Sequence, residues 1–426
     1  MPFISVPGHL HRRQFLAFLG GAALSLVAGP AAAAPGYRVG VGRGQDPYAA
    51  AAAALDAAPW PPGRMAGRRV LIKPNLVAAA PASSGVTTDP EIVRLVAERC
   101  LADGATEVLI VEGGPGVHFA ACGYGPLGGA GGGRVRLVDL AAEPSLLVPV
   151  PGGSACSALW LPELLLNPEI VFISVAKLKT HQLATATLST KSLFGLPPCP
   201  PYRLPRLQGR HGLHFRGVHQ VIADLVRLRP IDYALVDGIV GLEGNGPLAG
   251  TPVPMGQVLA GVNAVAVDRV GLAAMGIGQG LVPHLHYLAA AGLGPFSLDE
   301  IELAGSALRQ RPFQRPVLPP LLYGLWPEPA QAAPGQACRI VAWLGEPADC
   351  RLELVATRPE DAEGESLGVL ASSRQGRGLA SFIWDGRLGG QVLPPARYRL
   401  RLAATSLATS RTAWATGWLE IAAGSG

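Results

Sequence analysis

Residues 69–112 read RVLIKPNLVAAAPASSGVTTDPEIVRLVAERCLADGATEVLIVE. Two apolar runs, 69–72 and 106–112, have the composition of buried strands. Between them Asp89 is placed to cap a helix that has Pro90 in its first turn and runs to about residue 102. Continuous apolar strands joined by a helical crossover are typical of a parallel sheet covered on both faces.

The same alternation continues along the chain. We expect strands at 169–175, 233–236 and 257–259, and helices near 217–227 and 264–274. The sequence therefore predicts an α/β fold, a mostly parallel three-layer sheet domain over residues 36–304.

The C-terminal part has a different composition. Prolines cluster in residues 305–335, as in a linker. Residues 336–426 contain short alternating runs, which predict antiparallel strands with one wet face. Residues 382–398 resemble the end of the immunoglobulin-like sandwich found in flagellar-hook capping proteins and many secreted C-terminal modules. This resemblance implies a small all-β immunoglobulin-like sandwich over 336–426.

Residues 1–34 have the pattern of an export signal. Arg12 and Arg13 precede an apolar stretch at 15–27, and small residues follow to Ala34. The pattern indicates a secretory signal, and the arginine pair followed by Phe-Leu resembles the twin-arginine type. We expect the twin-arginine export machinery to deliver the protein to the periplasm or otherwise out of the cytoplasm. If the signal is not cleaved, it would serve as a membrane anchor.

Composition excludes several classes of protein. Hydrophobic residues make up 49% of the chain and charged residues 15%, which excludes a disordered chain. The net charge of +5 comes from scattered basic residues that form no continuous stripe, so no nucleic-acid partner is expected.

Lysine is scarce and unevenly placed. Only four of the 35 basic residues are lysines, and Lys177, Lys179 and Lys191 lie close together in the sequence. An ammonium group differs from a guanidinium group because it is compact and its pKa is easily lowered. The clustering therefore indicates a site at this place.

The segment 174–195 carries the densest set of reactive side chains. It follows a predicted strand, and ligands of parallel sheets bind at the carboxyl ends of strands. Lys177 and Lys179 alternate, so an extended chain places both on one face. We predict a catalytic group of His181, Lys177, Lys179 and Lys191, in which the lysines hold an anion and His181 acts as acid and base or as a metal ligand. The alternative is a solvated, polar strand end.

Five further residues follow other predicted strands and are expected to complete the pocket: Lys73, Asn75, Asp237, Glu243 and Asn245. Glycines flank the last three, so these residues either shape a turn or face the ligand. His181, His211 and His214 are candidate ligands of a divalent metal. The six cysteines contain no Cys-x-x-Cys pair, so no iron–sulfur cluster is expected.

Six ordered motifs resemble the domain of unknown function 362 family over about residues 70–275. They are residues 73–75, 88–91, 176–181, 190–195, 237–247 and 266–268. The resemblance implies the fold class rather than a reaction, because the activity of the family is unsettled. Some relatives carry a ferredoxin-type cysteine cluster, which this chain lacks.

Two functional hypotheses follow. The first is an exported enzyme or cofactor protein that binds a small anionic ligand in a pocket of lysine and histidine, with a divalent metal as one cofactor that would suit it. The second is a non-catalytic cell-envelope protein that binds a small anion and docks to an envelope partner through its C-terminal sandwich.

Overall fold

The computed structural model describes residues 36–114, 118–203, 209–214, 216–356 and 366–422. The predicted export signal, residues 1–34, lies outside the described residues. Within them, no helix has both the length and the apolar character needed to cross a bilayer.

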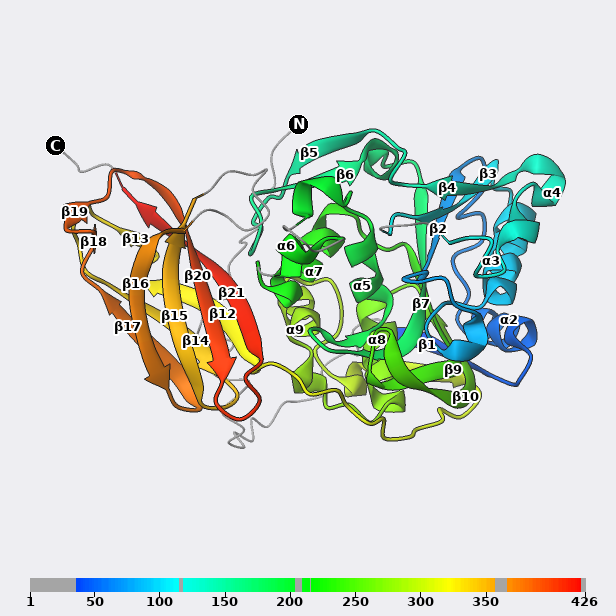
Figure 1. Cartoon of the computed structure of the whole chain (residues 1–426). Helices are drawn as coiled ribbons and strands as arrows, with labels where there is room; N and C mark the ends of the chain where they lie inside the picture. The colour runs from blue at the N-terminus through cyan, green and yellow to red at the C-terminus, as the bar shows by residue number, and fades with distance from the viewer. Residues whose placement is uncertain (1–35, 115–117, 204–208, 215, 357–365, 423–426) are drawn as a thin grey trace, which may run out of the picture.

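A mixed, mostly parallel sheet forms the centre of the α/β region (Figure 1). Its strand order is β11-β1-β10-β9-β7-β2-β3-β4, and β8 pairs with β7. The strands are β1 (Tyr37–Arg43), β2 (Arg69–Pro74), β3 (Glu107–Glu112), β4 (Val135–Asp139), β7 (Val171–His181), β8 (Thr185–Thr187), β9 (Tyr233–Asn245), β10 (Ala249–Gly261) and β11 (Ile301–Gly305). β10 runs antiparallel to both of its neighbours, β1 and β9, and β8 runs antiparallel to β7.

Helices cover both faces of this sheet. They are α2 (Pro47–Ala57), α3 (Pro90–Ala102), α4 (Ala130–Gly133), α5 (Ser189–Ser192), α6 (His211–His214), α7 (Val218–Leu228), α8 (Ala264–Ala274) and α9 (Pro283–Ala290). Successive residues of β2 alternate between the faces: Val70 and Ile72 join the apolar cluster of α2 and α3, and Leu71 joins that of α7, α8 and α9. The predicted cap is confirmed, since the Asp89 carboxylate accepts from Glu91 N at 2.9 Å.

Three strands run further than the sequence pattern indicated. β7 continues through the lysines to His181, and β9 and β10 form a long hairpin whose turn lies at residues 246–248. The sequence-based boundary assumed that the polar residues after Val175 are solvated and therefore end the strand. In the structure these residues are buried, and the strand continues through them. The lysine motif therefore belongs to the strand itself.

The C-terminal region is all β and contains several small sheets. One has the order β12-β14-β17, another the order β13-β21-β20-β15-β16, and β18 pairs with β19. The strands are β12 (Leu322–Glu328), β13 (Gln331–Ala332), β14 (Cys338–Leu344), β15 (Ala348–Val355), β16 (Ser366–Gln375), β17 (Gly378–Trp384), β18 (Arg387–Leu388), β19 (Gln391–Val392), β20 (Ala396–Ser406) and β21 (Thr412–Ile421). The larger two enclose a shared apolar core.

The proline-rich segment 305–335 divides between the two regions. Residues 306–321 lie along the α/β region, where Phe313 is buried and its backbone N donates to Met275 O at 2.8 Å. From Leu322 onward the chain forms β12, so the C-terminal region begins earlier than residue 336. The backbone of this segment finds hydrogen-bond partners on both sides, which a free linker would lack.

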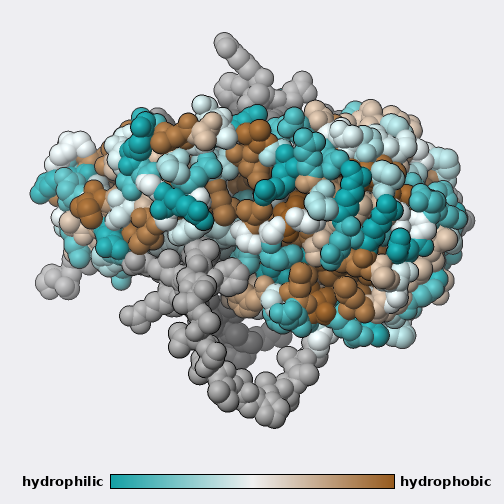
Figure 2. All heavy atoms as spheres, turned by 90° about the horizontal axis from the view of Figure 1, so that it is seen from below, coloured by the Kyte–Doolittle hydropathy of each residue, from teal (hydrophilic) through white to brown (hydrophobic). Residues whose placement is uncertain are grey.

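The two regions pack against each other through α7 and β21. The side chain of Gln220 is paired with the backbone of Thr416, at 2.7 Å and 3.0 Å, and the Thr416 hydroxyl donates to Arg216 O at 3.0 Å. Figure 2 shows apolar residues gathered along the boundary between the two regions on the face it displays.

Candidate functional site

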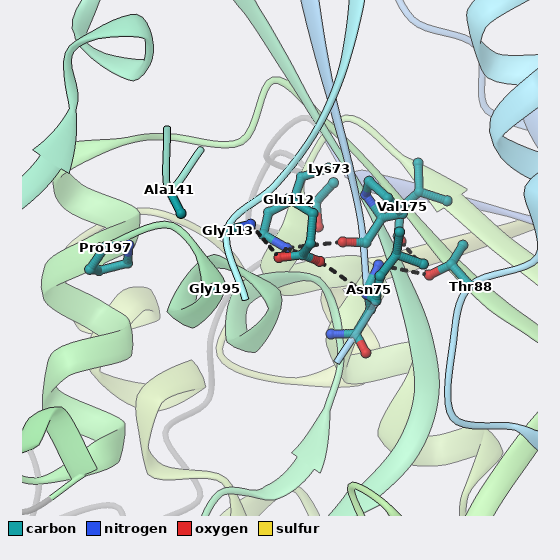
Figure 3. A network of polar contacts seen from close by, with 12 residues as sticks. Lys73, Asn75, Thr88, Glu112, Gly113, Ala141, Val175, Gly195 and Pro197 are labelled. Atoms are coloured by element: carbon teal, nitrogen blue, oxygen red, sulfur yellow. Dashed lines mark hydrogen bonds and ion pairs between the residues drawn. The ribbon is translucent and has the colours of Figure 1, made fainter. Parts of the chain in front are cut away.

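Lys73 and Glu112 form a buried ion pair at the carboxyl ends of the neighbouring strands β2 and β3 (Figure 3). The Lys73 ammonium donates to both carboxylate oxygens and to Pro74 O, each at 3.0 Å. Glu112 also accepts from Leu76 N at 3.0 Å and Gly113 N at 2.9 Å. All three donors of Lys73 are therefore used within the protein, which gives this residue a structural role in the unliganded state.

A glycine makes room for this pair. The segment η4 (Leu193–Gly195) passes over it, and a Cβ at Gly195 would lie 3.0 Å from the Lys73 ammonium and 3.1 Å from Glu112 Oε1. Most real Cβ contacts are longer than this, so an added methyl group would require the ion pair to shift by a few tenths of an ångström. The Phe194-Gly195 motif therefore fits α5 and η4 closely onto the sheet edge.

Lys177 and Asp237 form a second buried pair, between β7 and β9, at 2.7 Å. The Asp237 carboxylate also accepts from Asp89 N at 2.8 Å and Ile239 N at 3.0 Å. Burial, followed by the nearby Asp237 charge, raises the pKa of Asp89. This network ties the start of α3 to the two central strands.

Lys179 and Lys191 have no carboxylate partner in the part of the chain that the structure describes. The Lys179 ammonium donates to Val86 O at 2.7 Å, and this is its one hydrogen bond to the described residues. The Lys191 ammonium lies 4.4 Å from the centre of the Phe194 ring and makes no hydrogen bond or ion pair to the described residues. Burial lowers the pKa of Lys179 well below its usual range, and it lowers the pKa of Lys191 to about 7.

Three buried side-chain oxygen atoms of the α/β region also lack partners among the described residues: Asn75 Oδ1, Thr187 Oγ1 and Ser192 Oγ. Thr187 lies directly opposite Lys179 in the pairing of β7 with β8. Ser192 is the neighbour of Lys191 on α5, and Asn75 follows the end of β2. Buried polar atoms without partners are rare in native proteins and each costs stability. Thr187 and Ser192 lie next to two lysines that have no carboxylate partner among the described residues, which makes this place the candidate binding site.

His181 ends β7 and is 7% exposed. Its Nδ1 accepts from Leu183 N at 3.1 Å and from Ala184 N at 3.3 Å, so the neutral ring carries its proton on Nε2. Burial first, and the Lys191 charge next, lower the pKa of His181 well below its usual range. The neutral imidazole thus presents an N–H donor.

Of the three histidines predicted as metal ligands, His211 has a side chain that lies outside the described part of the structure. The rings of His181 and His214 lie 6.3 Å apart. Among the described residues, no group of three or more histidine, cysteine, aspartate or glutamate side chains is placed to hold a metal ion. Nδ1 of His181 is occupied by the two backbone donors, so a metal bound there would have to take Nε2 in place of its proton.

Glu243 and Asn245 belong to the β9–β10 hairpin. The Glu243 carboxylate accepts from Gln314 N at 2.8 Å and forms an ion pair with Arg311 at 3.2 Å. Asn245 is exposed at the end of β9. Glu243 thus holds the 306–321 segment against the sheet, which accounts for this residue without a ligand. The Asn245 backbone carbonyl accepts from the Gln182 side chain at 3.5 Å.

A cavity of about 70 Å³ lies beside the histidines, at the boundary of the two regions. Its wall includes His214 and His219 of the α/β region, Pro319 of the connecting segment and Trp414 of β21. Thr185 also lines it, with a left-handed backbone at φ 65° that is uncommon for a β-branched residue. No sequence pattern indicates this cavity, because its wall comes from segments about 200 residues apart.

Two proteins of known description align with parts of the chain. A thylakoid-associated protein of Synechocystis sp. is 26% identical over 240 residues, which are 55% of this chain and 71% of that protein. A structure of an alkylpurine DNA glycosylase of Pseudomonas fluorescens bound to DNA aligns with 24% of this chain and 30% of that one, at 12% identity and a TM-score of 0.17. A score this low gives no information on fold or function.

The family comparison covers the segment that builds the site. Residues 70–273, from β2 into α8, contain both ion pairs, Lys179, Lys191 and His181. This region of the chain matches the family described as a domain of unknown function, DUF362, which is the family that its six motifs resemble.

Proposed function

We propose that the protein binds a small anionic molecule at the carboxyl edge of the sheet, between β7, β8 and α5. The observation that carries this proposal is a pair of buried lysines, Lys179 and Lys191, whose ammonium groups have no carboxylate beside them among the described residues. Burying a charge without a partner is costly. An anion would provide the missing charge, and the partnerless Thr187 and Ser192 hydroxyls could donate to its oxygens.

We further propose that the site exchanges protons with its ligand, as an enzyme would. The pKa of Lys191 at about 7 places its charge change near neutral pH, where general acid and base catalysis is efficient. The Nε2–H of His181 adds a neutral donor on the adjacent strand. The apolar walls of the neighbouring cavity, including Val218 and Leu281, suit the carbon skeleton of an organic anion.

Export through the signal containing Arg12 and Arg13, and an immunoglobulin-like character of the C-terminal region, are part of the same proposal. The rival hypothesis is a binding protein that docks to an envelope partner through the C-terminal region. In that case the partner would use surfaces other than the side of β21 that packs on α7. Turnover of the bound anion would separate the enzyme from the binding protein.

The proposal is tested by calorimetric titration of the full chain with sulfate, phosphate and oxalate at pH 6.5. The matched variants are Lys191→Met and Arg43→Met, since Arg43 is an exposed cation far along the sheet. We expect at least one of these anions to bind, and Lys191→Met to weaken it by at least about 30-fold, the usual cost of removing one partner of a buried charge pair. Arg43→Met should bind like the wild type. Equal affinity in all three proteins, or no binding of any anion, would refute the proposal.

A further inference from the structure

The four lysines of the chain differ in how far their ammonium groups are used. Lys73 has three acceptors, Lys177 is paired with Asp237, and Lys179 donates to Val86 O. Lys191 makes no hydrogen bond to a described residue and rests against an aromatic ring instead. Among the described residues, the Lys191 nitrogen is therefore the one lysine nitrogen that no ion pair or hydrogen bond holds in its protonated, ammonium form.

We propose that Lys191 forms an imine with a small anionic carbonyl compound of the oxo-acid class. This inference rests on the proposed anion site and adds the chemical class of its ligand. In this arrangement Lys179, with N–H groups left over after its bond to Val86 O, binds the carboxylate. The hydroxyls of Thr187 and Ser192 lie on the flanking elements as further donors.

The surroundings of Lys191 suit a nucleophilic amine. The residue is 8% exposed and rests against Phe194. The Phe194 ring lies 4.4 Å from the ring of His214, which lines the cavity, whereas Lys191 itself is not among the residues that line it. At pH 7 the neutral fraction of an amine with a pKa of about 7 is on the order of a thousandfold larger than that of an ordinary lysine.

The reaction balances without any further reagent. The lone pair of the neutral Lys191 nitrogen attacks the carbonyl carbon, a C–N bond forms, and the carbonyl electron pair moves to oxygen. Both protons of the nitrogen pass to that oxygen, the C–O bond breaks, and water leaves. The products are the imine and one water molecule. His181, close enough for the Lys191 charge to lower its pKa, offers its Nε2–H to the carbonyl oxygen.

The experiment uses the full chain, pyruvate as the probe, and sodium borohydride to reduce any imine to a stable amine. Peptide mapping by mass spectrometry then locates the adduct, which is unambiguous because the chain has only four lysines. We expect the adduct on Lys191, in clear excess over the other lysines and the N-terminal amine. Omission of pyruvate is the blank, and acetone is the neutral control, expected to label much more weakly.

Absence of an adduct, or labelling spread evenly over the amines, would overturn the inference. Equal labelling by acetone would overturn the anionic class of ligand. Lys191→Arg should abolish labelling, and a melting curve shows whether it folds; if it does not, the wild-type peptide map and the pH dependence of labelling still decide. Lys191-dependent sulfate or oxalate binding without an adduct would reject the imine alone and leave the proposed function standing.

Discussion

Buried lysines occur in two neighbouring places that differ in what surrounds the ammonium groups. One is the sheet edge at β2, β3 and β9, and the other is the adjoining segment beside β8 and α5. At the sheet edge, Lys73 and Lys177 each face a carboxylate that backbone N–H groups also hold. Beside β8 and α5, Lys179 and Lys191 face carbonyl, hydroxyl and aromatic groups. The same residue type thus has a carboxylate partner in one region and none among the described residues in the other. Counter-charge, rather than burial, distinguishes the two.

The largest effect is expected from Lys177→Met. Asp237 would keep its two backbone donors but lose its buried ammonium partner. Breaking a buried pair in this way costs about 3–5 kcal/mol of unfolding free energy. Urea denaturation monitored by circular dichroism measures it. A loss below about 1 kcal/mol, the value of an exposed ion pair, would mean that the sheet edge is not held by this pair.

The matched change beside α5 should act in the opposite direction. Lys191→Met removes a buried cation that lacks a carboxylate, and apolar replacement of buried charge stabilises by about 1–4 kcal/mol in favourable cases. The pKa of Lys191 in the folded protein lies below its value in the unfolded chain. At and below pH 7 the folded wild type therefore carries the full free-energy cost of burying the charged ammonium group. That penalty shrinks as the pH rises towards 10.

The pH dependence makes this comparison specific. Unfolding free energies of the wild type and Lys191→Met should differ most near pH 7 and converge near pH 10. A variant that is less stable than the wild type at pH 7, by an amount similar to Lys177→Met, would erase the distinction between the two regions.

Gly195→Ala tests how closely η4 fits onto the ion pair of Lys73 and Glu112. The added methyl group would meet the Lys73 side chain, which its bonds to Glu112 hold in place, so we expect a loss of about 1–3 kcal/mol. Gly125→Ala is the control, because no atom lies within 4 Å of a Cβ built there. Thermal unfolding of both variants measures the difference. Equal melting temperatures would show that η4 can move away from the ion pair without cost.

Much of the fold was readable from local patterns. Asp89 caps α3 as its position before Pro90 indicates, and the alternation of Val70, Leu71 and Ile72 divides β2 between two helical layers. The end of β7 was not readable, since polar residues in sequence do not show whether they are buried.

The residues of the candidate site were also only partly indicated by the sequence. The scarcity of lysine pointed to Lys179 and Lys191. Thr187 and Ser192 lie in the same segment, 174–195, but were not named as site residues. The structural use of Lys73 and Lys177 depends on Glu112 and Asp237, which lie 39 and 60 residues away along the chain. Glu112 ends an apolar strand and carries no motif, so only the pairing of β2 with β3 brings it to Lys73.

Proton uptake on anion binding tests the central claim most directly. An anion beside Lys191 raises the pKa of the ammonium group, so above pH 7 binding must bring a proton with it. Sulfate does not titrate near pH 8, and calorimetry at that pH in two buffers of different ionisation enthalpy counts the protons. We predict that the wild type takes up about one proton more than Lys191→Met for each sulfate bound. Sulfate binding to the wild type with no proton uptake would contradict the account, because it would mean that Lys191 is already charged or lies outside the site.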